Sequence, residues 1–217
     1  MTTLKIRQFH FNMFEVNTFV VYDATSRQAM IIDPGMITAG EQNELFQFIE
    51  QEQLRVKHII HTHLHLDHIF GTTATRCAYP EATALAHSAD FTLGQTLPQQ
   101  AQRFHLAADL QPVEGLTPIE SLDEPLRLAE EQIEVRHLPG HSPGGVALYF
   151  PSLQASFSGD SLFQGSIGRT DLPGGNHAQL IRSIEKQLFT LPDQTTIYPG
   201  HGPSTTVASE KQYNPYL

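Results

Sequence analysis

The sequence predicts an α/β protein, because short apolar runs typical of β-strands alternate with longer segments that have the periodicity of amphipathic helices. The clearest strand-like runs are residues 19–22, 29–32 and 56–60, and the clearest helical patterns are residues 41–54 and 178–189. No internal linker interrupts this order of elements. We therefore expect one continuous fold rather than separate domains.

The first strand-like runs lead into a turn and then into a helix. The second run ends at residues 33–35, whose Asp-Pro-Gly sequence is a turn signal. In residues 41–54, Leu45, Phe48 and Ile49 recur at a spacing that places them on one helical face.

The strand-like run 56–60 leads into a cluster of ligand-type side chains, His63, His65, Asp67 and His68. Zinc, manganese and iron bind imidazole nitrogens and carboxylate oxygens. In an extended segment His63 and His65 point to the same side, so this pair can bind one metal. The remaining two ligands follow where the chain turns toward a helix, and the tight spacing favours a site for two metals.

The segments after this cluster are predicted to flank the site. A helix is expected from Ile69 to about Cys77, with the single cysteine packed in it. Residues 88–125 mix short apolar pieces with prolines, which predicts helical turns and loops that shape a substrate pocket.

Three later strand-like runs each end in a glycine-containing turn followed by a ligand-type residue. The strand over 133–137 precedes His141, and the runs ending at Ser158 and Tyr198 precede Asp160 and His201. Glycine lets the backbone approach closely at such turns. Ligands held on short turns at strand ends are a way to build a rigid site.

The last helical pattern, residues 178–189, has an identifiable start. Asn176 is a suitable N-cap, and Gln179 occupies the capping-box position three residues later.

Taken in order, the His63-x-His65-x-Asp67-His68 run, His141, Asp160 and His201 resemble the metallo-β-lactamase superfamily. The match spans nearly the whole chain, from residues 32–35 to residues 200–202. Within the superfamily, residues 168–173 and 214–217 are similar to those of the short glyoxalase II-like hydrolases. The resemblance implies an αββα sandwich of two mixed β-sheets flanked by helices, with the metals at one edge.

The resemblance also implies which residues hold the metals. His63, His65 and His141 would bind the first metal, and Asp67, His68 and His201 the second, with Asp160 bridging both. Two divalent ions are expected, zinc by preference, with iron or manganese as alternatives. Metal–ligand distances should be about 2.0–2.2 Å, and the two metals about 3.5–4 Å apart.

The implied activity is hydrolysis of an acyl thioester of the S-lactoylglutathione type by a metal-bridging hydroxide. Asp67 would orient the hydroxide as well as bind metal. Two further residues, Asp33 and Thr62, are candidates for hydrogen-bond support of the metal loop, although Asp33 could equally serve only the turn.

Substrate contacts are less fully specified by the resemblance. Classical glyoxalase II enzymes bind glutathione with a lysine and a tyrosine after the bridging aspartate and with a C-terminal helical domain. Here the corresponding segment holds Arg169 and Asp171, and the chain ends soon after His201. Arg169 could bind a substrate carboxylate, or it could pair with Asp171. We expect residues 1–217 to form one domain without the glutathione-binding extension.

Other functions stay open for this sequence. A persulfide dioxygenase would use a single iron bound by the counterparts of His63, His141 and Asp160. A lactonase would attack an ester, and a non-catalytic metal or redox protein is a further alternative. A β-lactamase is disfavoured, because the common dizinc enzymes place a cysteine where this chain has Asp160, and the only cysteine is Cys77.

Composition excludes several classes of partner. The net charge of −10 disfavours a broad nucleic-acid surface. No segment is long and apolar enough to predict a membrane span, and the first residues lack the apolar stretch of a signal peptide. The sequence therefore predicts a cytoplasmic enzyme with a small-molecule thioester substrate. It leaves the oligomeric state open.

Overall fold

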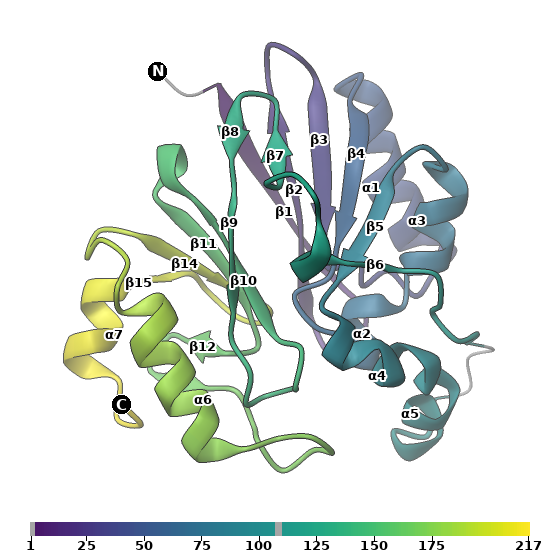
Figure 1. The fold of residues 1–217 in the computed structure, drawn as a ribbon. Helices are drawn as coiled ribbons and strands as arrows, with labels where there is room; N and C mark the ends of the chain where they lie inside the picture. The colour runs from purple at the N-terminus through teal and green to yellow at the C-terminus, as the bar shows by residue number, and fades with distance from the viewer. Residues whose placement is uncertain (1–2, 107–109) are drawn as a thin grey trace.

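The computed structural model describes residues 3–106 and 110–217. Its architecture is an αββα sandwich, in which two β-sheets face each other and helices cover both outer surfaces (Figure 1). The α/β class is the one that the sequence pattern predicts, and the sandwich is the one that the resemblance implies.

The first sheet is built from the N-terminal part of the chain and has six strands. In spatial order these are β1 (Leu4–Phe11), β2 (Val16–Asp23), β3 (Gln28–Ile32), β4 (Arg55–Ile60), β5 (Thr83–Ala86) and β6 (Thr117–Pro118). The first three strands are antiparallel, whereas β3 to β6 run parallel to one another, so the sheet is mixed.

The second sheet comes from the C-terminal part and has five strands. Its order is β15 (Thr205–Thr206), β14 (Thr196–Pro199), β11 (Ala155–Gly159), β10 (Val146–Phe150) and β9 (Glu134–His137). It is also mixed, because β11 and β14 are parallel while the other neighbours are antiparallel. Two small hairpins complete the strands, β7 (Arg127–Leu128) with β8 (Glu131–Gln132) and β12 (Leu162–Phe163) with β13 (Ser166–Ile167).

The helices lie outside the sandwich or near its lower edge (Figure 1). They are α1 (Ala39–Gln51), α2 (Leu66–Ile69), α3 (Thr72–Ala78), α4 (Phe91–Gln95), α5 (Leu97–Arg103), α6 (His177–Ser183) and α7 (Val207–Tyr213). Short 3₁₀ turns cover Ser88–Asp90, Ile119–Ser121 and Pro151–Leu153, and a π-helical turn, Ile184–Leu188, continues α6. None of the helices among the described residues has the length and hydrophobicity needed to cross a lipid bilayer.

The alternation of side chains along each strand explains how the layers pack. Phe19 and Met30 point into the core between the sheets, where they meet Phe157 of the second sheet. Their neighbours Val20 and Ile31 point to the opposite surface, which α1 covers. A strand buried on both faces reads as a continuous apolar run, which is why residues 19–22 and 29–32 show little polar alternation.

Most of the predicted elements are confirmed, with shifted ends. Helix α1 begins after Thr38, whose side chain accepts a hydrogen bond from Glu41 N at 3.2 Å in a capping box, so the helix starts earlier than predicted. Asn176 caps α6 as predicted, accepting from Gln179 N at 3.0 Å. The prolines of residues 88–125 lie among helical turns, loops and the short strand β6, while residues 107–109 of this segment fall outside the described part.

Two expectations near the ligand cluster are wrong. The single helix from Ile69 is instead two short helices, because α2 starts inside the cluster and ends before Gly71. A side chain at Gly71 would meet the carbonyl of Pro34, whose oxygen accepts a hydrogen bond from Gly71 N at 2.8 Å, so the chain breaks where it contacts the preceding turn. Cys77 lies in α3 but is exposed rather than packed.

Candidate metal centre

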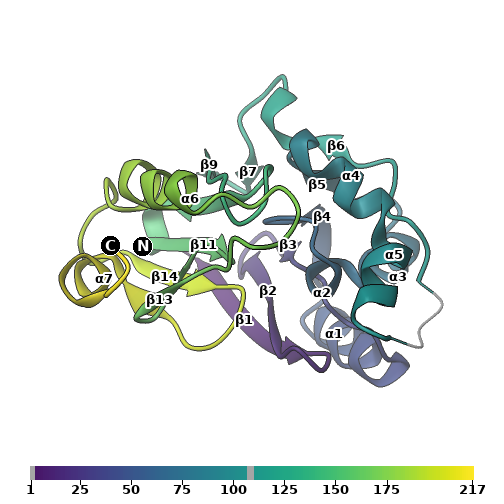
Figure 2. The ribbon, with the colours of Figure 1, turned by 90° about the horizontal axis from the view of Figure 1, so that it is seen from below.

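The predicted ligands gather at the edge of the sandwich where several strands end. Parallel strands β3 and β4 bring their carboxyl ends to this edge, and β11 and β14 of the other sheet do the same. Figure 2 views the molecule from below, toward this edge. Strand ends of both sheets therefore supply side chains to one place, as expected for a site built on a rigid scaffold.

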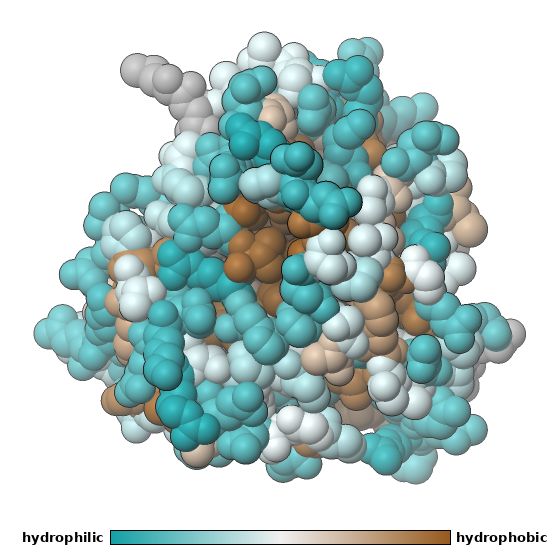
Figure 3. All heavy atoms as spheres, viewed as in Figure 1, coloured by the Kyte–Doolittle hydropathy of each residue, from teal (hydrophilic) through white to brown (hydrophobic). Residues whose placement is uncertain are grey.

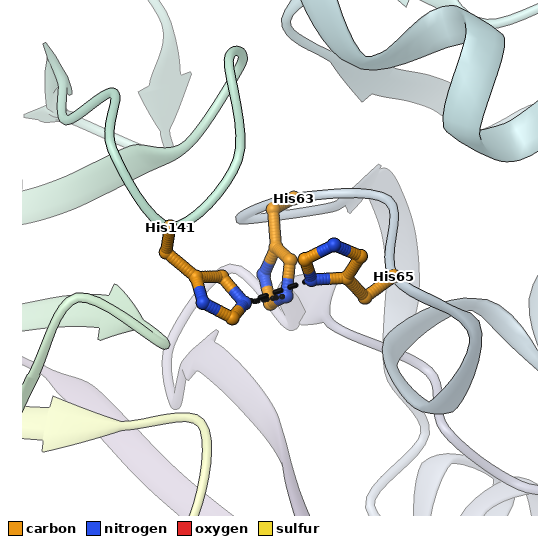
Figure 4. A group of neighbouring side chains, drawn as sticks. All are labelled: His63, His65 and His141. Atoms are coloured by element: carbon orange, nitrogen blue, oxygen red, sulfur yellow. Dashed lines mark hydrogen bonds between the residues drawn. The ribbon is translucent and has the colours of Figure 1, made fainter. Parts of the chain in front are cut away.

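The first group consists of His63, His65 and His141, whose rings point toward one another from two separate loops (Figure 4). The Nε2 atom of His141 lies 2.8 Å from Nδ1 of His65 and 3.2 Å from Nε2 of His63. Nitrogens bound tetrahedrally to one zinc at about 2.0–2.1 Å lie about 3.3 Å apart. The three nitrogens are thus already close to the spacing that a single metal requires.

The second group consists of Asp67, His68 and His201. The carboxylate oxygen Oδ2 of Asp67 lies 3.0 Å from Nε2 of His201 and 3.6 Å from Nε2 of His68. This set combines imidazoles with a carboxylate, a donor set that fits a divalent cation.

Asp160 lies between the two groups. Its Oδ2 is 3.7 Å from His141 Nε2 in the first group and 3.6 Å from His201 Nε2 in the second. Its Oδ1 is 3.3 Å from His68 Nε2. One carboxylate therefore faces both sets of imidazoles, as a bridging ligand must.

Unsatisfied polar atoms show that these residues fit a bound cation. His68 Nε2 and Asp160 Oδ1 are buried and make no hydrogen bond to any described residue. Buried polar atoms rarely remain without a partner. Because both atoms face the space between the ligand groups, the donor chemistry suits a metal ion there.

The protonation states of the ligands favour the binding of a metal cation. Burial holds the pKa of His63 well below its usual value and lowers the pKa of His65 to about 3, so both rings are neutral ligands at pH 7. Burial lowers the pKa of His68, but Asp67, Asp160 and Asp33 outweigh it and raise that pKa well above its usual value. The same negative charge that favours a proton on His68 favours a metal ion beside it.

Two of the imidazoles are oriented by one buried carboxylate, that of Asp33. Asp33 accepts from the backbone N–H of Thr62 at 2.7 Å and from the Thr62 hydroxyl at 2.6 Å, and it lies 3.0 Å from His68 Nδ1. The Thr62 oxygen is in turn 3.2 Å from His63 Nδ1. With each Nδ1–H donating outward, the Nε2 atoms of His63 and His68 keep their lone pairs for a metal.

Backbone carbonyls fix the other two Nε2 ligands in the same way. His141 Nδ1 lies 2.8 Å from the carbonyl oxygen of Arg169, and His201 Nδ1 lies 2.9 Å from that of Phe14. His65 differs, because its Nδ1 faces the first group.

Close packing at the ligand turns explains two of the glycines. A Cβ atom at Gly200 would overlap Asp160 Oδ1, and one at Gly159 would overlap the Thr62 hydroxyl. Gly159 also has a φ of 52°, a left-handed conformation that favours glycine. Larger residues at these turns would displace Asp160 or its supports.

Four polar residues that hold the ligand loops were not predicted from the sequence. Asn17, which is buried, donates to the carbonyls of Pro199 and Gly202 at 2.9 Å on either side of His201. Asn12 donates to the carbonyl of Asp67 at 3.1 Å. No motif marks either asparagine, since each acts through backbone atoms of a distant segment.

The other two missed residues are Asp90 and Gln100. Asp90 is buried and accepts from Leu64 N at 3.2 Å, Ser142 Oγ at 2.7 Å and Gly144 N at 2.6 Å, so it joins the two loops of the first group. Gln100 accepts from Leu66 N at 3.1 Å. Both lie in the proline-containing segment 88–125, which was predicted to flank the site but in which no motif marks a single residue.

Three other residues near the ligands have structural contacts. Arg169 forms a two-armed ion pair with Asp171, with both N–O distances 2.7 Å. Tyr198 packs in the core, its ring stacked on Phe157 with centroids 5.2 Å apart. His61 is buried beside the site, 3.4 Å from the Thr72 hydroxyl, and belongs to neither ligand group.

An open cleft of about 260 Å³ adjoins the ligands. It is lined by Phe14, His65, Leu66, Asp67, Leu93, Gln100, Arg103, Phe104, His141, Asp160, Arg169, Leu172, Pro173 and His201. Ligand atoms of both groups therefore face a space that is largely apolar but carries two arginines, which is a suitable setting for a small-molecule substrate.

A second pocket lies away from the predicted metal ligands. Figure 3 shows apolar side chains gathered near the centre of one face. Leu126, Ile133 and Val135 are among the residues that line this second pocket, of about 510 Å³. It contains the stacked rings of His87 and His137, with centroids 4.1 Å apart. None of the predicted ligands lines it, and these histidines belong to no group of the described residues that could hold a metal.

Comparison with known proteins agrees with this geometry. The family model described as Metallo-beta-lactamase superfamily matches residues 12–201. Hydroxyacylglutathione hydrolase GloC of Haemophilus influenzae is 37% identical over 207 residues, which cover 94% of this chain and 93% of that protein.

Two solved structures are similar over almost their whole length. The structure titled BLEG-1 B3 metallo-beta-lactamase has a TM-score of 0.85 and 33% identity, and the alignment covers 98% of this chain and 99% of that one. The structure titled TTHA1623 in a di-iron-bound form has a TM-score of 0.83 and 34% identity, with 97% and 100% covered.

Proposed function

The chain belongs to the metallo-beta-lactamase superfamily, and we propose that within this family of metallo-hydrolases it hydrolyses acyl thioesters of the S-lactoylglutathione type. The observation that carries the proposal is the pair of ligand groups joined by Asp160 beside an open cleft. A purely structural metal site would be closed by protein ligands, whereas both groups here face the cleft.

The proposed ligand roles follow the two groups. We assign His63, His65 and His141 to one divalent ion, Asp67, His68 and His201 to the other, and Asp160 to both, with zinc as the expected metal. When bound, such ions would lower the pKa of a water molecule and polarise a substrate carbonyl.

The residues of the chain supply position and charge for this reaction. Water adds to the thioester carbonyl carbon, the carbon–sulfur bond breaks, and the products are a carboxylic acid and a thiol. The Asp67 carboxylate lies at the boundary between the second group and the cleft, so it can accept a hydrogen bond from the attacking water and orient it. Burial acts to raise the pKa of Asp67, but His68 and His201 outweigh it and lower that pKa, so the group stays a carboxylate.

The name of the Haemophilus influenzae relative, hydroxyacylglutathione hydrolase, supports a thioester substrate. A second candidate is hydrolysis of a β-lactam, favoured by the neighbour titled a B3 metallo-beta-lactamase at 33% identity. The di-iron-bound title of the other neighbour supports iron as an alternative metal. A single-iron persulfide dioxygenase, which would bind iron with His63, His141 and Asp160, is the alternative that the experiment below separates from the hydrolase.

Metal analysis combined with substrate assays tests the proposal. The protein is purified without added metal, its metals are quantified, and release of free thiol from S-lactoylglutathione is measured beside β-lactam hydrolysis. About two metals per chain with thiol release supports the dinuclear thioesterase. A single iron with oxygen consumption on glutathione persulfide would replace it with the dioxygenase, and β-lactam turnover alone would replace it with the lactamase.

Three expectations about the setting of the enzyme remain predictions. They are a cytoplasmic location, a small-molecule substrate without nucleic-acid or membrane partners, and one domain formed by residues 1–217.

A further inference from the structure

Two arginines line the cleft, and their charges are not equally available. The guanidinium of Arg169 is paired with both carboxylate oxygens of Asp171. Arg103 also lines the cleft, but it forms no ion pair with any residue in the described part of the chain. The net charge of the protein is −10, and Arg103 is a positive charge at the cleft that no carboxylate among residues 3–106 and 110–217 pairs with.

The position of Arg103 is fixed by its helix. Gln100 lies three residues earlier on α5, and residues three apart share a helical face. The Gln100 side chain accepts from Leu66 N at 3.1 Å and donates to Leu93 O at 2.7 Å. The face of α5 that carries Arg103 is therefore attached to the start of α2, next to His65 and Asp67.

An aromatic wall lies next to this charge. The ring of Phe104 packs edge-on against Phe14, with centroids 5.6 Å apart and planes at 83°. The carbonyl oxygen of Phe14 contacts His201 Nδ1 at 2.9 Å, so this wall is joined to the second ligand group. Because Phe14, Arg103 and Phe104 all line the cleft, an occupant would meet apolar rings together with a guanidinium that no described carboxylate pairs with.

We propose that Arg103 makes this enzyme selective for anionic thioesters, by pairing with a substrate carboxylate while the adjoining apolar part of the substrate packs on Phe14 and Phe104. This inference rests on the proposed thioesterase function. It assigns the charge selectivity to Arg103 and not to Arg169, whose charge Asp171 already neutralises.

Matched substrates that differ by one charge test the proposal. One pair is the S-acetyl thioesters of 3-mercaptopropionate and 3-mercaptopropionamide, and the other is succinyl and succinamoyl thioesters of one neutral thiol. We expect kcat/KM of the metal-loaded enzyme to favour the carboxylate by about threefold to fivefold at low salt in at least one pair, the size expected of a solvent-exposed ion pair.

The variants locate the origin of that preference. Arg103→Gln should reduce it to about one, Arg103→Lys should retain it in part, and Arg103→Glu should reverse it. Arg55→Gln is the matched control, because it removes the same charge at the amino end of β4, away from the ligands that follow the carboxyl end. Its preference should equal that of the unmodified enzyme.

Several outcomes would overturn the proposal. If Arg103→Gln keeps the preference for the carboxylate substrate, another residue is responsible for the charge selectivity. If the preference disappears in Arg169→Gln instead, that residue is Arg169. A loss of thermal stability in Arg103→Gln without a change in preference leaves Arg103 only as a stabilising charge at the end of α5. Hydrolysis of both members of each pair at equal rates refutes the inference alone, whereas no thioester hydrolysis refutes the proposed function and the inference with it.

Discussion

The floor and the mouth of the cleft are built in different ways. We call the proposed metal ligands the floor, and the side chains of Phe14, Arg103, Phe104 and Arg169 the mouth. His63 and His68 of the floor are 2% and 0% exposed, whereas Phe104 is 37% exposed and the Arg169 side chain 55%.

The difference lies in how each side chain is held. Four of the five floor imidazoles have their outward nitrogen fixed by Thr62, Asp33 or a backbone carbonyl. Mouth residues are held by ring contacts and by a solvent-exposed ion pair. We infer that the floor determines the reaction and the mouth adjusts the choice of substrate. Changes in the floor should therefore have much larger effects.

The largest effect is expected from removing a floor ligand. His65→Ala or Asp67→Ala should lower thioester turnover by about a thousandfold or more, because each takes a donor from one ligand group. The measurement is kcat, together with the circular dichroism spectrum to show that the fold is retained. His10→Ala, a change at an exposed histidine of β1, is the control. Near-normal turnover in either ligand variant would contradict the assignment.

A smaller effect is expected from Asp33, which contacts the ligand His68 and is not itself a proposed ligand. Asp33→Asn should weaken metal binding by about tenfold to a hundredfold, because an amide has only one accepting oxygen and cannot accept both from Thr62 N on one side and from His68 Nδ1 on the other. Asparagine tolerates the left-handed backbone of this residue, whose φ is 51°, so the turn should survive. Titration against a competing chelator gives the affinity. An unchanged affinity would show that Asp33 serves only the turn.

Asp90 joins the two loops of the first ligand group, and its loss should affect stability. Asp90→Asn replaces a carboxylate that accepts three hydrogen bonds by an amide with one accepting oxygen. The free energy of unfolding should fall by about 1–3 kcal/mol, the usual cost of leaving a buried donor unsatisfied. Urea unfolding measures it. An unchanged midpoint would mean that water replaces the lost contacts.

The smallest effect is expected in the mouth. Phe104→Ala should raise KM for a thioester by a few-fold and leave kcat nearly unchanged, because an exposed ring contributes binding but no transition-state contact. Steady-state kinetics on one substrate tests this. A fall in kcat comparable to that of His65→Ala would remove the distinction between floor and mouth.

The same distinction explains how much of the site could be read from the sequence. The ligands stand next to strand ends and glycine turns, so His141, Asp160 and His201 are recognisable from their neighbours along the chain. The mouth combines Phe14, α5 and Arg169, which meet only after folding, and of these only Arg169 lies in a segment that the sequence marked. Asn17 and Asp90 escaped notice for the same reason, since their partners are distant backbone groups.

The fold was predictable to a similar degree. Apolar runs marked the central strands, because a strand between two layers is apolar on both faces. The break between α2 and α3 was not predictable, since it depends on contact between Gly71 and the turn at Pro34 rather than on local helix propensity.

The contacts of Asn17 have a consequence for the order of assembly during folding. Asn17 N donates to Gly200 O at 2.7 Å, and its side chain spans Pro199 and Gly202, so the His201 turn is held by a residue more than 180 positions earlier in the chain. Contacts of such sequence separation form late, because the intervening loop must first be closed. On a ribosome the Asp67, His68 and His201 group therefore cannot assemble until the chain has emerged past His201, whereas His63, His65 and His141 are all available once it has emerged past His141.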